Sequence, residues 1–527
     1  MRGKITILLM MIGMVSCSRE EFSTDRGLDY NYGQDLRHDM IVLGERLENP
    51  YTTKNMTKAL SSLYPTKADR TDVKTTDLYV RFLPSDDAQY DFLDDLGLHL
   101  TDCPMDYEIV VDGDWYHDPS IPKEKVTWQY AVVPEDFDFP DHIRYEIIDE
   151  CFIAEHSVGT RSDGIDWEAV EREAYLLTGN ESRLVSATTR AVSKVQPSGR
   201  ITIEDKGFKG GLPYGVAGVQ VSCNSFVKFD HAYTDRDGYY KMKKTFASDL
   251  RYRLVFKNEK GFSIGLNLVL VPASVSTLGK SSPEGVSMTV TGDSDSKLFR
   301  RCVVNNAAYD YMSRCKPEDL GIAMPPGDLR IWILDFLEAS SAVMLHHGAL
   351  IRHDLITSYL GVYADLIEAF LPDITVGTKG IREYDRIYST TCHELAHASH
   401  FAKVGTGYWD KYISYIIESF LVSQDMTYGD GNGERAGYCE IGEMWAYYLE
   451  SKMYKERYGG TYPTFGTSFW FYPQIFRYLH ERGVSCREIF DVLDTSVKSK
   501  MELKAALISS LPSDRVTVEQ VFSRYGD

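Results

Sequence analysis

Short runs in which polar and apolar residues alternate occur through the first third of the chain and predict β-strands. Residues 77–83 and 128–133 both show this alternation, which is typical of strands with one buried face. Residues 49–51 contain a proline turn signal, and residues 55–60 then favour a short helix. We therefore expect residues 17–195 to form an α+β domain, in which the sequence shows no chemical motif.

Residues 196–275 have a purely β pattern. Short apolar runs at 200–203, 216–221 and 252–256 are separated by turn residues, and such even spacing predicts a small β-sandwich. The stretch 215–221, taken with the Thr-Asp-Arg-Asp-Gly-Tyr-Tyr stretch, resembles the carboxypeptidase regulatory-like, transthyretin-type module. That resemblance implies a spacer or docking domain and no active site of its own.

The rest of the chain, 276–527, changes to a mainly helical pattern. Residues 298–312 and 358–370 favour helices, and residues 328–335 and 373–377 favour short strands. These elements predict a small sheet packed against a long helix and a helical lobe. Because 527 residues are too many for one hydrophobic core, the expected fold class is a multidomain α+β protein.

The net charge of the chain limits the binding partners that we expect. Lys and Arg number 57 against 77 Asp and Glu, which gives 57 − 77 = −20 at pH 7. An acidic surface repels phosphate backbones, so nucleic acid is not expected as a partner.

The N-terminus has the features of an export signal. A basic start at 1–4 precedes eleven apolar residues at 5–15, a run too short to span a bilayer comfortably. Ser16 and Cys17 follow and resemble the lipobox of bacterial lipoproteins, which implies a signal peptide at 1–16 and a membrane tether on acylated Cys17. The alternative is an ordinary signal peptide with a cysteine there by chance. The acidic stretch 18–21 resembles a signal for surface-exposed lipoproteins of the outer membrane, with a periplasm-facing anchor as the alternative.

The candidate chemistry begins with a histidine pair. His393 and His397 are four residues apart in the sequence Cys-His-Glu-Leu-Ala-His, and Ser389, Thr390 or Thr391 is expected to cap the start of their helix. Residues i and i+4 share one helix face, so both imidazoles can bind one Zn²⁺. Glu394 is displaced around the helix and can act as a general base on a metal-activated water.

A third protein ligand is needed to complete a catalytic zinc site. His400 lies on the same helical stripe, but ligands along one helix do not easily surround a tetrahedral ion, and Lys403 breaks the extended pattern with a third histidine. Glu440 and Glu443 share one face of a later predicted helix.

The second helix supports a family resemblance. Glu443-Met444-Trp445-Ala446 resembles the Glu-x-x-Ala helix of gluzincin metallopeptidases, which implies Glu443 as the third ligand and Glu440 as a hydrogen-bond partner of a ligand histidine, with exchanged roles left open. The resemblance covers roughly residues 280 to 527. In these enzymes a Tyr or His stabilises the oxyanion; Tyr462, Tyr472 and His480 are candidates, although core packing also explains each of them.

Together these features resemble the zinc metallohydrolase lipoproteins associated with substrate import. The resemblance implies Zn²⁺ as cofactor, a protein or peptide substrate, and association with an outer-membrane nutrient-import system. Two alternatives are a non-catalytic binding or scaffold lipoprotein with an idle or structural zinc site, and a zinc hydrolase acting on a non-peptide amide.

Two cysteines precede the predicted site residues directly. Cys392 comes before His393, and Cys439 comes before Glu440. Where the two helices meet, these cysteines either form a disulfide or remain buried thiols.

Overall fold

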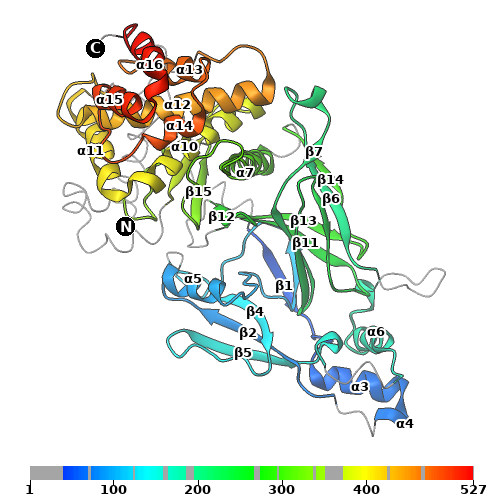
Figure 1. Ribbon diagram of the computed structural model, residues 1–527. Helices are drawn as coiled ribbons and strands as arrows, with labels where there is room; N and C mark the ends of the chain where they lie inside the picture. Colours follow the sequence, from blue (N-terminus) through cyan, green and yellow to red (C-terminus); the bar gives the residue numbers. More distant parts are fainter. Residues whose placement is uncertain are drawn as a thin grey trace.

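The structure is a computed structural model, shown in Figure 1. It describes residues 40–68, 73–122, 125–157, 164–184, 195–265, 273–292, 296–335, 340–349, 372–423, 428–464 and 469–525. These residues form a mixed α+β protein with several β-sheets, in agreement with the predicted α+β composition. The predicted signal peptide, Cys17 and the predicted helix at 358–370 lie outside the described residues.

The N-terminal elements surround a three-stranded antiparallel sheet with the order β4-β2-β5. They are β1 (Val42–Arg46), α3 (Thr53–Leu63), α4 (Pro65–Ala68), β2 (Asp77–Leu83), α5 (Asp87–Asp95), β3 (Tyr107–Val111), β4 (Gln129–Pro134), β5 (Arg144–Cys151) and α6 (Trp167–Leu177). The strands predicted at 77–83 and 128–133 and the helix predicted at 55–60 are confirmed as β2, β4 and part of α3. In α3, the Thr52 hydroxyl caps the helix start by accepting from the Asn55 N–H.

The central strands belong to two sheets. They are β6 (Ser198–Ile203), β7 (Tyr214–Gly215), β8 (Val219–Ser225), β9 (Lys228–Tyr233), β10 (Tyr239–Lys241), β11 (Leu250–Asn258), β12 (Phe262–Ile264), β13 (Val275–Ser281) and β14 (Met288–Val290). One sheet has the order β10-β6-β14, and the other has the order β16-β15-β12-β11-β8-β9. The predicted β-strands of this region are confirmed. The predicted domain boundary at residue 275 stays a prediction. Strands β13 and β14 lie at or beyond that point and pair with β11 and β6.

The larger sheet continues into the C-terminal elements. These are α7 (Ser296–Arg314), β15 (Leu329–Leu334), β16 (Ile374–Gly377), α10 (Tyr384–Val404), α11 (Thr406–Ser423), α12 (Ala436–Tyr458), α13 (Gln474–His480), α14 (Cys486–Asp491), α15 (Lys500–Ser510) and α16 (Arg515–Phe522). Strand β12 pairs parallel with β15, and β15 pairs parallel with β16. The predicted helix at 298–312 and the two predicted strands are confirmed as α7, β15 and β16.

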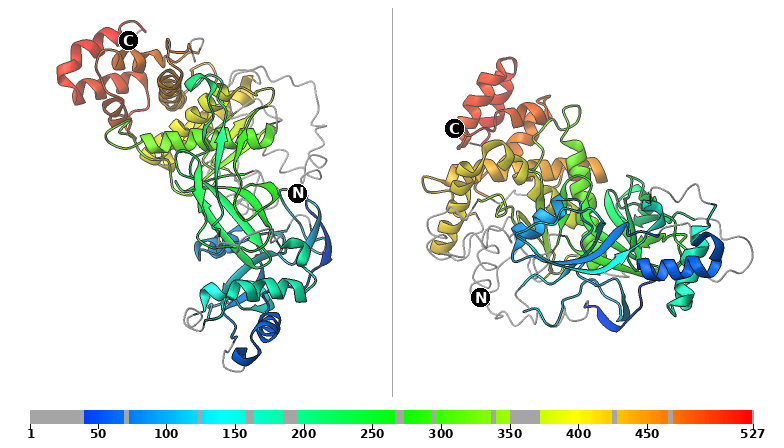
Figure 2. Two further views of the ribbon diagram at one scale, coloured as in Figure 1. Left: turned by 90° about the vertical axis from the view of Figure 1, so that its right-hand side faces the viewer. Right: turned by 90° about the horizontal axis from the view of Figure 1, so that it is seen from below.

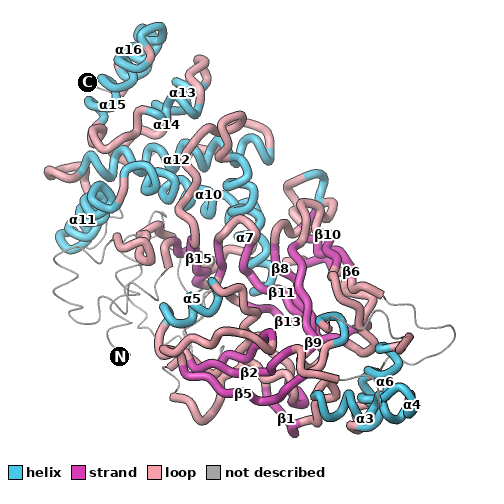
Figure 3. Tube along the Cα trace, turned by 60° about the horizontal axis from the view of Figure 1, so that its bottom comes forward, coloured by secondary structure: helices cyan, strands magenta, loops and turns pink. Residues whose placement is uncertain are grey.

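The C-terminal helices α10 to α16 gather at one end of the molecule, and the N-terminal elements lie at the other end, with the central strands between them (Figures 1 and 2). Figure 3 shows α10, α11 and α12 packed side by side. One cluster of buried apolar side chains extends from Ile201 in β6 to Phe522 in α16. The metal-site helices are therefore packed on a core that they share with the central strands.

No helix among the described residues is both long enough and apolar enough to cross a membrane.

Candidate metal centre

Helix α10 carries the predicted histidine pair. It begins at Tyr384, without a side-chain cap, and ends before Gly405, whose φ of 75° suits the end of a helix. The predicted start at Ser389, Thr390 or Thr391 is therefore wrong, because the chain is already helical there. The hydroxyl of Thr391 instead donates back to the carbonyl of Ile387 at 2.7 Å.

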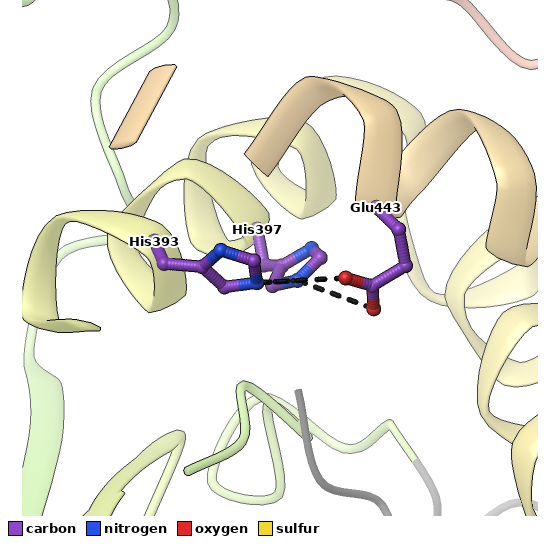
Figure 4. A group of neighbouring side chains, drawn as sticks. All are labelled: His393, His397 and Glu443. Atoms are coloured by element: carbon purple, nitrogen blue, oxygen red, sulfur yellow. Dashed lines mark hydrogen bonds and ion pairs between the residues drawn. The ribbon is translucent and has the colours of Figure 1, made fainter. Parts of the chain in front are cut away.

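His393 and His397 point to the same side of α10, as Figure 4 shows. Their Nε2 atoms are only 3.2 Å apart, and both side chains are buried. The i, i+4 spacing therefore brings two imidazole nitrogens together.

Helix α12 supplies the third member of the group. Glu443 places Oε2 at 3.5 Å from His393 Nε2 and Oε1 at 3.5 Å from His397 Nε2 (Figure 4). One ligand atom from each of the three residues lies within 4.8 Å of the other two, and all three residues are buried. The structure thus brings together the three residues predicted as ligands.

The two other predicted candidates lie outside this group. The Glu440 carboxylate accepts the backbone N–H of Lys500 at 3.0 Å. His400 is buried against the rings of Tyr408 and Trp409, and neither ring nitrogen has a hydrogen-bond partner among the described residues.

The separations fit a tetrahedral metal ion. Ligand atoms that each lie about 2.0–2.1 Å from a tetrahedral zinc are roughly 3.3 Å apart. His393 Nε2 and His397 Nε2 are 3.2 Å apart, and each lies 3.5 Å from a different oxygen of Glu443, Oε2 and Oε1 respectively. Two imidazoles and one carboxylate are also a donor set that catalytic zinc sites use. The residues present therefore fit a divalent ion, although the donor set alone does not identify zinc.

His393 is oriented by a carboxylate that the sequence pattern did not predict. Its Nδ1 lies 3.0 Å from Glu450 Oε2, and the other oxygen of Glu450 accepts the Ser389 hydroxyl at 2.7 Å. A proton on Nδ1 that is donated to Glu450 leaves the lone pair of Nε2 facing the centre. The prediction that Glu440 makes this contact is wrong, because Glu450, about three turns further along α12, makes it instead.

Two tyrosines contact the ligand residues. The Tyr412 hydroxyl, from α11, donates to Glu443 Oε1 at 2.5 Å, and the Tyr447 ring lies 4.5 Å from the His393 ring, centre to centre. The three residues proposed for oxyanion stabilisation make other contacts. Tyr472 packs on Tyr525, His480 bonds the carbonyl of Val484, and Lys455 lies over Tyr462.

Glu394 is the most unusual carboxylate of the centre. It is fully buried, and neither of its oxygens has a hydrogen-bond partner among the described residues. Burial raises its pKa, and the carboxylates of Glu443 and Glu450 add to this effect, so that the pKa is about 8 although His393 lowers it. This group can therefore exchange a proton near neutral pH.

In the metal-free centre, His393 and Glu443 shift each other's pKa. Burial lowers the pKa of His393, but hydrogen bonds to Glu443 and Glu450 outweigh that effect and raise it to about 10. Burial also raises the pKa of Glu443, but the two histidines outweigh this effect and hold it well below its usual range. Two carboxylates thus favour positive charge at the centre, whether it is carried by a proton or by a metal ion.

Cys392 and Cys439 are both buried free thiols. The sequence left open either a disulfide or two thiols, and the structure has the two thiols.

No protein-family model matches the chain, and no curated protein matches it either. Among solved structures, the chain is similar to a crystal structure of (S)-allantoin synthase, at 15% identity and a TM-score of 0.13. The matched region covers 24% of this chain and 48% of that protein, which is less than half of its length. A similarity of this size carries no argument about fold or function.

Proposed function

We propose that this protein is a zinc-dependent peptidase with Glu394 as its general base. The observation that carries the proposal is the buried carboxylate of Glu394, which has no hydrogen-bond partner among the described residues. Glu394 directly follows His393, which converges with His397 and Glu443. A carboxylate in that condition costs folding free energy, and a purely structural metal site has no use for it.

The chemistry divides between the ion and the chain. A bound Zn²⁺ would polarise the scissile carbonyl and lower the pKa of an attacking water toward about 7. Glu394 would take the proton from the attacking water and return it to the leaving amine, a role that its buried position next to the ligand His393 allows. Glu450 holds the ring of His393, and Tyr412 holds the carboxylate of Glu443.

The finer architecture belongs to the same proposal. Residues 276–527 would form a zincin-like domain, in which α10 and α12 face each other as in gluzincins, and residues 196–275 would form a carboxypeptidase regulatory-like module. Acylated Cys17 would tether the protein to the outer membrane beside a nutrient importer. Metabolic labelling with a fatty-acid analogue tests the tether, because labelling must disappear in Cys17→Ser.

One observation favours a second candidate function, a binding or scaffold protein with a structural metal. His393, His397, Glu394 and Glu443 are at most 3% exposed, and structural zinc sites are closed whereas catalytic sites keep an open position. The two functions differ in what they require of Glu394.

Replacing Glu394 by Gln distinguishes the peptidase from the binding or scaffold protein. The enzyme account expects the variant to retain the metal but to lose cleavage of a peptide library by at least about 100-fold, since general acid–base catalysis contributes roughly 10²–10⁴-fold. Glu440→Gln is the matched control and should cleave like the wild type. If the wild-type protein binds the metal but cleaves no peptide, the scaffold account is favoured.

A further inference from the structure

A small pocket lies between α12, α13 and the residues around 463–464, next to the metal centre. Its volume is about 20 Å³, which is room for about one water molecule or the tip of one polar group. A pocket of this size takes one functional group and not a whole ligand. Tyr447, Tyr448 and two prolines form its apolar walls, and Ser451, Gln474 and Arg477 are among its polar lining residues.

Arg477 is the cationic residue of this lining. Its side chain is 24% exposed, and its contact with Glu481 spans 3.8 Å, which is too long for a hydrogen bond. Its Nε atom is buried and has no hydrogen-bond partner among the described residues, and the same holds for Oε1 of Gln474. A guanidinium offers five N–H donors in a planar fork that matches a carboxylate, and the neighbouring amide can accept an N–H.

The surroundings add positive charge to the same region. Arg477, Arg482 and Arg524 lie 4.7, 5.6 and 5.4 Å from the centre of the Tyr478 ring, and Lys455 lies 3.9 Å from the ring of Tyr462. On a protein whose net charge is −20, such a cluster attracts an anion to this point. Glu481 offsets part of this charge, but it is 41% exposed and therefore well solvated.

The pocket and the metal centre share a wall. Tyr447 lines the pocket, and its ring lies 4.5 Å from the ring of His393. Ser451 also lines the pocket and directly follows Glu450, the partner of His393. A substrate bound at the metal would therefore reach this pocket past the ring of Tyr447.

We propose that this pocket is a substrate-recognition site in which Arg477 binds a carboxylate and the Gln474 amide binds an adjacent peptide N–H. The proposal rests on the peptidase function and deepens it by naming a substrate class. The carboxylate belongs either to the C-terminus of a peptide or to an acidic side chain close to the scissile bond.

Cleavage of one peptide library made in two forms, free acid and C-terminal amide, tests the proposal with the zinc-loaded protein. If the carboxylate is C-terminal, only the free acids are cleaved; if it is a side chain, both forms are cleaved near Asp or Glu. In either case Arg477→Gln should raise KM by about 10–100-fold with little change in kcat. Arg487→Gln should behave as the wild type, because Arg487 has a similar 3.8 Å contact with an acidic residue, Asp491, but does not line the pocket. Equal cleavage of neutral amides by the wild type and Arg477→Gln overturns the proposal.

A binding measurement keeps the two proposals separable. Succinate should raise the melting temperature of the zinc-loaded wild type more than neutral succinamide does at matched ionic strength. Arg477→Gln should lose this difference, and Arg477→Lys should recover part of it, which distinguishes lost recognition from poor folding. An unchanged succinate effect in a folded Arg477→Gln variant, including one that arises only from succinate on the metal, overturns the proposal. If the wild type cleaves neither library, the peptidase function fails, and the succinate measurement still decides the role of the pocket.

Discussion

Glu450 and His393 lie on different helices, and Glu450 Oε2 is 3.0 Å from His393 Nδ1. The contact joins α12 to α10 and turns Nε2 of His393 toward His397 and Glu443. The sequence separation of the two residues is 57, so the pair forms only when the two helices pack in register. The relationship assigns Glu450 an orienting role at the metal centre.

Glu450→Gln should weaken zinc binding by about 10–100-fold, because carboxylate partners of ligand histidines typically contribute that much to metal affinity. Competition with a chromophoric chelator measures the affinity. Glu440→Gln serves as the control, since the Glu440 carboxylate bonds the Lys500 backbone and not the centre. Equal losses in both variants would show that the assignment of Glu450 is incorrect.

Metal uptake near pH 7.5 should release at least one proton. The pKa of His393 is raised to about 10 in the metal-free protein, so His393 is protonated at this pH and must lose that proton to bind metal through Nε2. Affinity should therefore rise as pH rises from about 6.5 to 9, by up to tenfold per pH unit for each proton released. Calorimetry in buffers of different ionisation enthalpy counts the protons, and a flat pH dependence would contradict the charge balance described for the centre.

Tyr412→Phe should lower zinc affinity by roughly tenfold. The variant removes the hydroxyl that donates to Glu443 Oε1 at 2.5 Å, and hydrogen bonds to charged groups contribute about 1.5–3 kcal/mol. Tyr408→Phe is matched to it, because the Tyr408 hydroxyl bonds the Val497 carbonyl instead. Zinc affinity that is unchanged in Tyr412→Phe would mean that Glu443 needs no such support.

Gly437→Ala should destabilise the protein through the start of α12. A Cβ at this position would lie 1.9 Å from the carbonyl oxygen of Lys498, and overpacking of this kind costs about 1–3 kcal/mol or more. Gly407→Ala in α11 is the control, since a Cβ there meets nothing within 4 Å; it should be neutral or stabilising by up to about 1 kcal/mol. Thermal unfolding of the two variants gives the comparison, and the reverse order would be incompatible with this packing of α12.

The sequence predicted the parts of the site that depend on local geometry. The four-residue spacing of His393 and His397 dictates a shared helix face, and their Nε2 atoms meet as expected. Glu443 was selected on a motif from the second helix and joins them. The roles of these residues in metal binding and catalysis stay predictions.

The remaining features depend on how segments far apart in the sequence pack together. Glu450 was missed because a contact between helices depends on their register, although its spacing of seven residues from Glu443 places both on one face of α12. The start of α10 was placed too late, because no side chain caps it at Tyr384 and the hydroxyl residues inside it serve other bonds. The sequence pattern changes from strands to helices near residue 275. This change did not predict that β14, which lies beyond that point, pairs with β6.

Anomalous X-ray diffraction at the zinc absorption edge, on crystals of the zinc-loaded protein, tests the central claim most directly. The account predicts one strong peak about 2.0–2.2 Å from His393 Nε2, His397 Nε2 and a Glu443 oxygen, and no such peak in His393→Ala. A zinc-loaded protein that shows no peak within bonding distance of these three residues, or only a peak at other side chains, would contradict it.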